Sequence, residues 1–137
     1  MVGLKVHFFL YQIGSGDFLH SFFSTVAYHL EGGEWGTRFP HIMNELYQGK
    51  LSAQSMAAAL SELGEIKEGL KQLSPDKVVW DIDDLSKQPP WGSNISPDIT
   101  DMSNYYVTSD GEDFMTVFLH ALEKAAKLGK PVAIESV

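Results

Sequence analysis

The chain contains no cysteine and no long apolar run, and each absence excludes a class of protein. Without cysteine there are no disulfides, no thiol nucleophile and no zinc site built from thiolates. No stretch approaches the ~20 apolar residues of a membrane-spanning helix. The N-terminus has no basic leader before an apolar run, so we expect no signal peptide. We therefore expect a cytoplasmic protein that does not associate with membranes.

Basic residues are also scarce, and this shortage is concentrated in one stretch. The whole chain carries a net charge of −8, with ten lysines and arginines against eighteen acidic residues. Residues 76–113, which we call the acidic segment, hold nine carboxylates against two lysines, a local charge of −7. The nine are Asp76, Asp81, Asp83, Asp84, Asp98, Asp101, Asp110, Glu112 and Asp113. Such a surface repels nucleic acids and anionic membranes and favours a positively charged protein as partner.

Length and periodicity predict one domain over residues 1–137 with an α+β or α/β fold. Strand patterns fall at residues 4–11, 78–82, 105–108 and 132–134. Helical spacing of apolar residues predicts three main helices at residues 18–30, 53–73 and 111–128, and a short one at 40–48. Ser109 and Glu112 have the spacing of a capping box for the last main helix. We expect a small mixed β-sheet packed with these helices.

Two aspartates after the second predicted strand suggest one enzymatic alternative. Residues 78–83 resemble the opening of phosphotransferases, where Asp81 and Asp83 would share a hard cation and supply a nucleophile. Only 54 residues follow Asp83, too few for the Rossmann-like core of such enzymes. Asp84 and Leu85 also occupy the turn where small residues would admit a phosphate. A small metal-dependent phosphotransferase-like enzyme therefore remains only an alternative.

The five histidines suggest no further chemistry. His20 and His29 lie on one predicted helix, but nine residues at about 100° each place them on opposite sides. The turn at residues 14–17 lacks the lysine and third glycine of phosphate-binding loops. We therefore expect no catalytic residue, no cofactor, no metal and no enzymatic activity.

Aromatic residues accompany the charges of the acidic segment. Trp80 and Trp91 lie within it, and Pro89 and Pro90 stiffen the path between them. Residues 83–104 are irregular, and a loop of that length is more often functional than idle. An exposed tryptophan with an acidic rim is a typical binding hot spot. The candidate partner-binding residues are Asp81, Asp83, Asp84, Trp91, Asp98 and Asp101.

Short segments rich in glycine, aromatic residues and aspartate recur along the chain. They are residues 11–17, 35–40, 80–84 with 89–92, and 104–111. Together they resemble the immunity protein 70 family of bacterial polymorphic toxin systems. The resemblance implies a cytoplasmic bacterial antitoxin that binds the cognate toxin domain of a polymorphic or contact-dependent growth inhibition system, with no active site of its own. A non-catalytic adaptor subunit of another complex is the remaining alternative.

Overall fold

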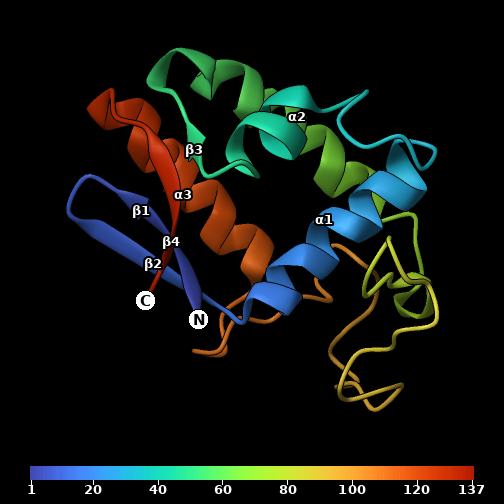
Figure 1. The fold of residues 1–137 in the computed structure, drawn as a ribbon. Helices are drawn as coiled ribbons and strands as arrows, with labels where there is room; N and C mark the ends of the chain where they lie inside the picture. The colour runs from blue at the N-terminus through green and yellow to red at the C-terminus, as the bar shows by residue number, and fades with distance from the viewer.

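The computed structural model describes residues 1–137 as a four-stranded sheet packed against helices (Figure 1). The strands are β1 (Val2–Val6), β2 (Phe9–Gly14), β3 (Lys50–Leu51) and β4 (Val132–Ser136), in the order β2-β1-β4-β3. Every neighbouring pair is antiparallel. The prediction of an α+β fold is confirmed, and the sheet is antiparallel throughout where a mixed one was expected.

The first predicted strand, residues 4–11, is a hairpin and not a single strand. Strand β1 pairs with β2 through a turn at His7 and Phe8. His7 has a positive φ of 54°, a conformation that histidine adopts more often than most residues with a side chain. Because no glycine, proline or asparagine marks this turn, the sequence pattern did not reveal it. Leu4 and Val6 face the core, as their alternation predicted.

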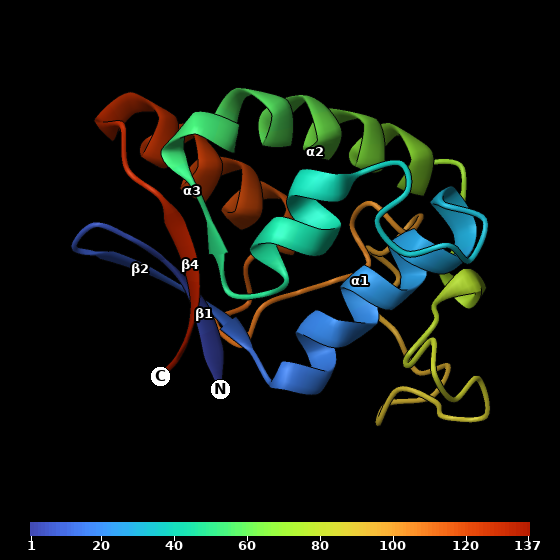
Figure 2. The same ribbon diagram turned by 45° about the horizontal axis from the view of Figure 1, so that its top comes forward.

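Three main helices are present, as predicted. They are α1 (Gly16–Leu30), α2 (Met56–Leu70) and α3 (Phe114–Leu128). In the two views α3 lies against the sheet, α2 runs beside α3, and α1 lies farther from the sheet (Figures 1 and 2). A cluster of 29 buried apolar residues fills the space between these elements. None of the helices is long and apolar enough to cross a lipid bilayer.

The ends of the helices differ from the predicted ones. A 3-10 turn, η2 (Ala53–Ser55), precedes α2, and the short helix predicted at residues 40–48 is a π-helix, η1 (His41–Leu46). Helix α3 starts at Phe114 because the Asp113 carboxylate accepts a hydrogen bond from the Thr116 amide at 3.2 Å. This cap replaces the predicted capping box.

The connection from α1 to η1 is organised by the buried carboxylate of Glu31, which is 7% exposed. It accepts hydrogen bonds of 3.0 Å from the backbone amides of Gly36, Arg38 and Phe39. Gly36 has a φ of 82°, and a Cβ there would come within 2.1 Å of the Asn44 side chain. The backbone angle therefore favours glycine, and a larger residue would also have to displace the Asn44 side chain.

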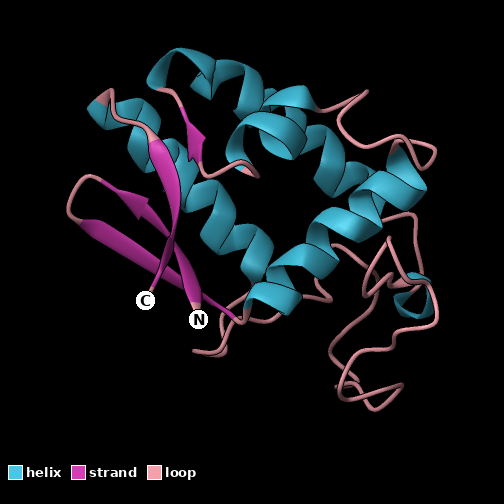
Figure 3. Cartoon of the chain, viewed as in Figure 1, coloured by secondary structure: helices cyan, strands magenta, loops and turns pink.

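Residues 78–113 contain no regular strand or helix, although strands were predicted at 78–82 and 105–108 (Figure 3). In place of the strand predicted at 105–108, the structure has only an isolated β-bridge between Val107 and Asp113. The first fails because the backbone at Val79 and Ile82 bonds to side chains of α1 instead of to a neighbouring strand. A pattern of apolar, β-branched residues indicates that a segment is extended and partly buried. It does not indicate which groups accept and donate the hydrogen bonds of its backbone.

Candidate functional site

The acidic segment lies mostly at the end of the molecule away from the sheet (Figure 2). Apart from the 3-10 turn η3 (Pro75–Lys77), its backbone is irregular until α3 begins. Irregular backbone on a surface is where binding residues are most often found, provided that a rigid scaffold positions it. The scaffold here is helix α1.

Three hydroxyl side chains on α1, all buried, hold the start of the acidic segment. The Thr25 hydroxyl accepts the Val79 amide at 2.9 Å, and the Ser21 hydroxyl donates to the Val79 carbonyl at 2.9 Å. The Ser24 hydroxyl accepts the Ile82 amide at 3.1 Å. The amide and carbonyl of the buried Val79 and the amide of Ile82 are therefore satisfied by α1, as buried backbone requires.

Tyr106 completes this buried network from the other end of the segment. Its hydroxyl lies 2.9 Å from the Ser21 hydroxyl and 2.8 Å from that of Thr25. Burial raises the pKa of Tyr106, so the ring stays neutral and can donate a hydrogen bond. The network ties residues 79 and 106 to the same turn of α1 and closes the base of the intervening loop.

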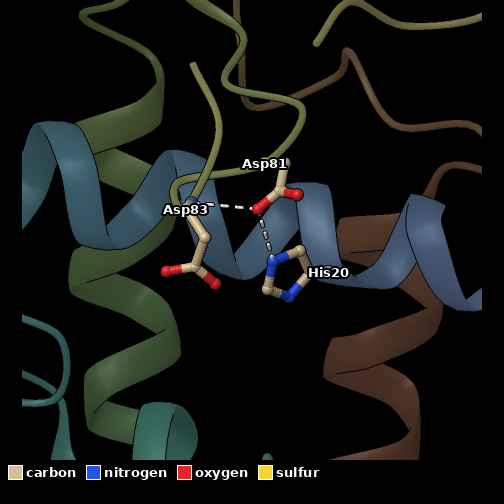
Figure 4. Close-up of side chains that lie close together, drawn as sticks. All are labelled: His20, Asp81 and Asp83. Atoms are coloured by element: carbon tan, nitrogen blue, oxygen red, sulfur yellow. Dashed lines mark hydrogen bonds and ion pairs between the residues drawn. The ribbon is translucent and has the colours of Figure 1, made fainter. Parts of the chain in front are cut away.

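This anchoring brings Asp81 against His20 of α1 (Figure 4). His20 Nε2 lies 3.2 Å from Asp81 Oδ1, and His20 Nδ1 lies 2.8 Å from the Tyr47 hydroxyl. The same Asp81 oxygen accepts the Asp83 amide at 2.9 Å, while Oδ2 lies 3.4 Å from Lys87 Nζ. The Asp83 amide, helped by His20 and Lys87, holds the pKa of Asp81 below its ordinary value.

Sequence reasoning missed the part that His20 plays here. Spacing along one helix relates His20 only to His29, whereas the carboxylate bonded to His20 belongs to Asp81, 61 residues away. One potential ligand atom from each of His20, Asp81 and Asp83 lies within 4.8 Å of the other two. The sequence does contain one sign of this contact, namely three residues with hydroxyl side chains close to His20: Ser21, Ser24 and Thr25. These three side chains hold the acidic segment against α1.

The other candidate carboxylates lie farther along the loop. Asp84 is exposed and accepts hydrogen bonds from the amide and hydroxyl of Ser86, which lower its pKa. Asp98 is exposed. Asp101 is half-buried; burial acts to raise the pKa of its carboxyl, but the hydrogen bonds from Ser103 hold it below the ordinary value. Asp83 and Asp98 are therefore freer to face a partner than Asp81 and Asp101.

Trp91 lies at the surface in a fixed orientation. Its side chain belongs to a residue that is 38% exposed, and its indole N–H donates to the Tyr105 hydroxyl at 2.8 Å. Trp80 packs edge-on against it with ring centroids 5.4 Å apart. Two hollows of about 620 and 190 Å³ share Ile95 and Tyr105 in their walls, and Trp91 lines the smaller one. No basic residue lines either hollow.

Comparison with known proteins identifies the family. The family model described as Immunity protein 70 matches residues 4–134, which include the whole acidic segment and all three main helices. No curated protein and no solved structure matches the chain significantly. Because the match covers nearly the entire sequence, the chain belongs to the immunity protein 70 family.

Proposed function

We propose that the protein binds and neutralises a cognate toxin domain in the cytoplasm, and that the acidic segment supplies the binding surface. Membership of an immunity protein family supports the neutralising role. The observation that carries the choice of surface is the charge of −7 confined to residues 76–113. Much of this segment is irregular backbone at one end of the molecule.

The charges favour a basic partner. Asp83, Asp84 and Asp98 are exposed, so their field extends into solvent and speeds the approach of a positively charged protein. Toxins that act on nucleic acids need basic grooves for their substrates. A row of carboxylates can occupy such a groove as a mimic of phosphates. The same field is screened by salt, with a Debye length of about 8 Å at physiological ionic strength.

Trp91 supplies an apolar anchor beside these charges. Its hydrogen bond to Tyr105 fixes the ring before any partner arrives, so binding loses little side-chain entropy there. A tryptophan beside a hollow that a partner side chain can fill matches the typical composition of binding hot spots. We infer that the charges steer the encounter and that Trp91 contributes most to the lifetime of the complex.

The loop is also organised in advance by its own polar groups. The Asn104 side-chain oxygen accepts the amides of Thr100 and Asp101, and its nitrogen donates to the Asp98 carbonyl. Asp101 in turn accepts the Ser103 amide at 2.7 Å. A loop held in this way does not have to be ordered on binding, which favours affinity.

The enzymatic alternative loses one of its premises. Asp81 and Asp83 do not follow a strand, because residues 78–82 form none. We expect phosphatase and nuclease assays with Mg²⁺, Mn²⁺ or Zn²⁺ to give no turnover. Turnover that disappears in Asp81→Asn would establish the enzyme instead, and stable co-purification with a housekeeping protein would favour an adaptor.

The main test compares two double charge reversals. Asp83→Lys with Asp84→Lys changes the acidic segment, and Glu65→Lys with Glu68→Lys makes the same change in charge on exposed positions of α2. The probe is the purified toxin domain encoded beside this protein. We expect the first pair to weaken binding at least about tenfold, or 1.4 kcal/mol, mainly through slower association at low salt. The melting temperature should change little, because exposed charges contribute little to stability.

Two results would contradict the proposal in different ways. If the wild-type protein does not bind the toxin domain, toxin neutralisation itself is refuted. If it binds but both double variants bind equally well, the acidic segment is not the interface. The next surfaces to test would then be the sheet around Lys5, Phe9 and Tyr11, or the region of Trp35 and Arg38.

A further inference from the structure

We infer that His20, Asp81 and Asp83 form a binding site for a divalent transition-metal ion, with Zn²⁺ as the best fit. One potential ligand atom from each of the three residues lies within 4.8 Å of the other two. In Figure 4 the histidine comes from α1 and both aspartates come from the turn above it. The inference does not depend on the proposed toxin binding, since it concerns the isolated protein.

The donor set selects the kind of ion. It combines one imidazole nitrogen with two carboxylate oxygens. Ca²⁺ and Mg²⁺ prefer all-oxygen sites, whereas Zn²⁺ is commonly bound by histidine together with aspartate or glutamate. Three protein ligands leave a fourth position of a tetrahedral ion for water.

The geometry is close to what such an ion requires. Bonds of about 2.1 Å in a tetrahedral site place the ligand atoms roughly 3.4 Å apart. His20 Nε2 and Asp81 Oδ1 are already 3.2 Å apart. Asp83 has to approach by roughly an ångström, and it is free to do so, because its side chain is exposed and its carboxylate makes no hydrogen bond within the protein.

The ligands are held by neighbouring groups in the way that metal ligands usually are. The Tyr47 hydroxyl lies 2.8 Å from His20 Nδ1, so when Nε2 exchanges its hydrogen bond with Asp81 for an ion, a proton on Nδ1 can donate to that oxygen. Metal-bound histidines typically donate their other ring nitrogen to a polar group in this way. The ring is also flanked by Trp35, stacked at 6.0 Å. The Asp83 amide holds the Asp81 carboxylate from the other side.

Charge and space are compatible with a bound ion. Asp17 lines the same small hollow as His20, Trp80, Asp81 and Lys87, whose volume is about 60 Å³. A water in bulk liquid occupies about 30 Å³, so a metal-bound water fits. Lys87 is the competing cation, but its side chain is 58% exposed and touches Asp81 from 3.4 Å. It can therefore turn into solvent when an ion with two charges replaces it.

The expectation that the chain binds no metal rested on the absence of cysteine and on histidines that diverge along one helix. The structure supplies carboxylates from a distant segment in place of further histidines. A bound ion would link residues 81–83 directly to α1. This link would add to the hydroxyl contacts that already hold the acidic segment.

The test is calorimetric titration of metal-free protein with ZnCl₂ in a buffer that does not bind zinc. We expect one saturable site for each chain. Asp83→Asn should weaken it at least about tenfold, in line with the effect of losing a metal ligand or its support. Asp84→Asn is the matched control, because it removes the same charge one residue away and should leave the affinity within about twofold. Neither variant removes a buried group, so both should fold.

A second readout assigns the site to its histidine. In ¹H–¹⁵N spectra of the histidine rings, Zn²⁺ should shift the Nε2 resonance of His20 and spare His120, which lies on α3 and lines a hollow with Glu123. The inference is overturned by the absence of saturable binding. Equal affinities of Asp83→Asn and Asp84→Asn, or zinc-dependent shifts confined to histidines other than His20, would overturn it as well.

Discussion

Replacing Glu31 by glutamine should be among the most destabilising single changes that keep the shape of a side chain. Its carboxylate oxygens accept three backbone amides, at 3.0 Å each: Oε1 accepts Gly36, and Oε2 accepts Arg38 and Phe39. Glutamine has only one oxygen, so its NH₂ group must face at least one of these amides. Two donors then oppose each other in a site that is 7% exposed.

The magnitude follows from this change in hydrogen bonding. A buried amide left without an acceptor costs about 1–3 kcal/mol, and bonds to a neutral oxygen are weaker than bonds to a carboxylate by roughly 1 kcal/mol. The sum predicts that Glu31→Gln lowers the free energy of unfolding by about 2–4 kcal/mol. For a chain of this size, each kcal/mol corresponds to about 4 °C, so the melting temperature should fall by about 8–16 °C.

Urea unfolding followed by circular dichroism measures this loss, and Glu34→Gln is the control. Glu34 is exposed and its carboxylate makes no hydrogen bond within the protein, so its replacement should change stability by less than about 0.5 kcal/mol. If the two variants are equally stable, the Glu31 carboxylate does not organise the connection between α1 and η1. Other contacts would then have to fix that connection.

Two further predictions concern the core and the acid limb of stability. Leu63→Ala and Phe118→Ala, at sites 2% and 1% exposed, should each lower the free energy of unfolding by about 2–5 kcal/mol in urea. Leu85→Ala, at an exposed site, should lower it by less than about 0.5 kcal/mol. Similar losses at all three sites would show that Leu63 and Phe118 do not belong to the core. The Ser52 amide holds the pKa of Glu45 below its ordinary value. Glu45 therefore binds a proton more readily in the unfolded chain than in the folded protein. The resulting stability is present above about pH 5 and is lost as the pH falls below about 4. Glu45→Gln should therefore flatten the decline of the unfolding free energy as the pH falls below about 5, and an unchanged slope would refute this role for Glu45.

The helices were predictable because their apolar stripes are local signals. In α1, Phe18, Phe22 and Val26 recur at helical spacing and are all buried. The hairpin at His7 was not predictable, since the turn uses a residue type that rarely marks one. The π-helix could not be foreseen either, because helical spacing over six residues does not distinguish one helical hydrogen-bonding pattern from another.

The candidate site was only half visible in the sequence for a similar reason. Asp81 and Asp83 stood out through local charge and spacing. His20 lies beside Asp81 only because Ser24 and Thr25 bind the backbone of residues 79–82 to the same helix. Contacts between segments so far apart leave no periodic trace in a single sequence. The role of these residues in binding a toxin stays a prediction.

The central place of β4 in the sheet has a consequence for how the protein is made. β4 lies between β1 and β3 and is the last of these four strands to be synthesised. Until then β3 has no partner and β1 pairs only with β2. At roughly 5–20 residues per second, the nascent chain waits on the order of ten seconds between its first strand and the one that completes the sheet. A sheet built in this way cannot form in full until residues 132–136 have been synthesised.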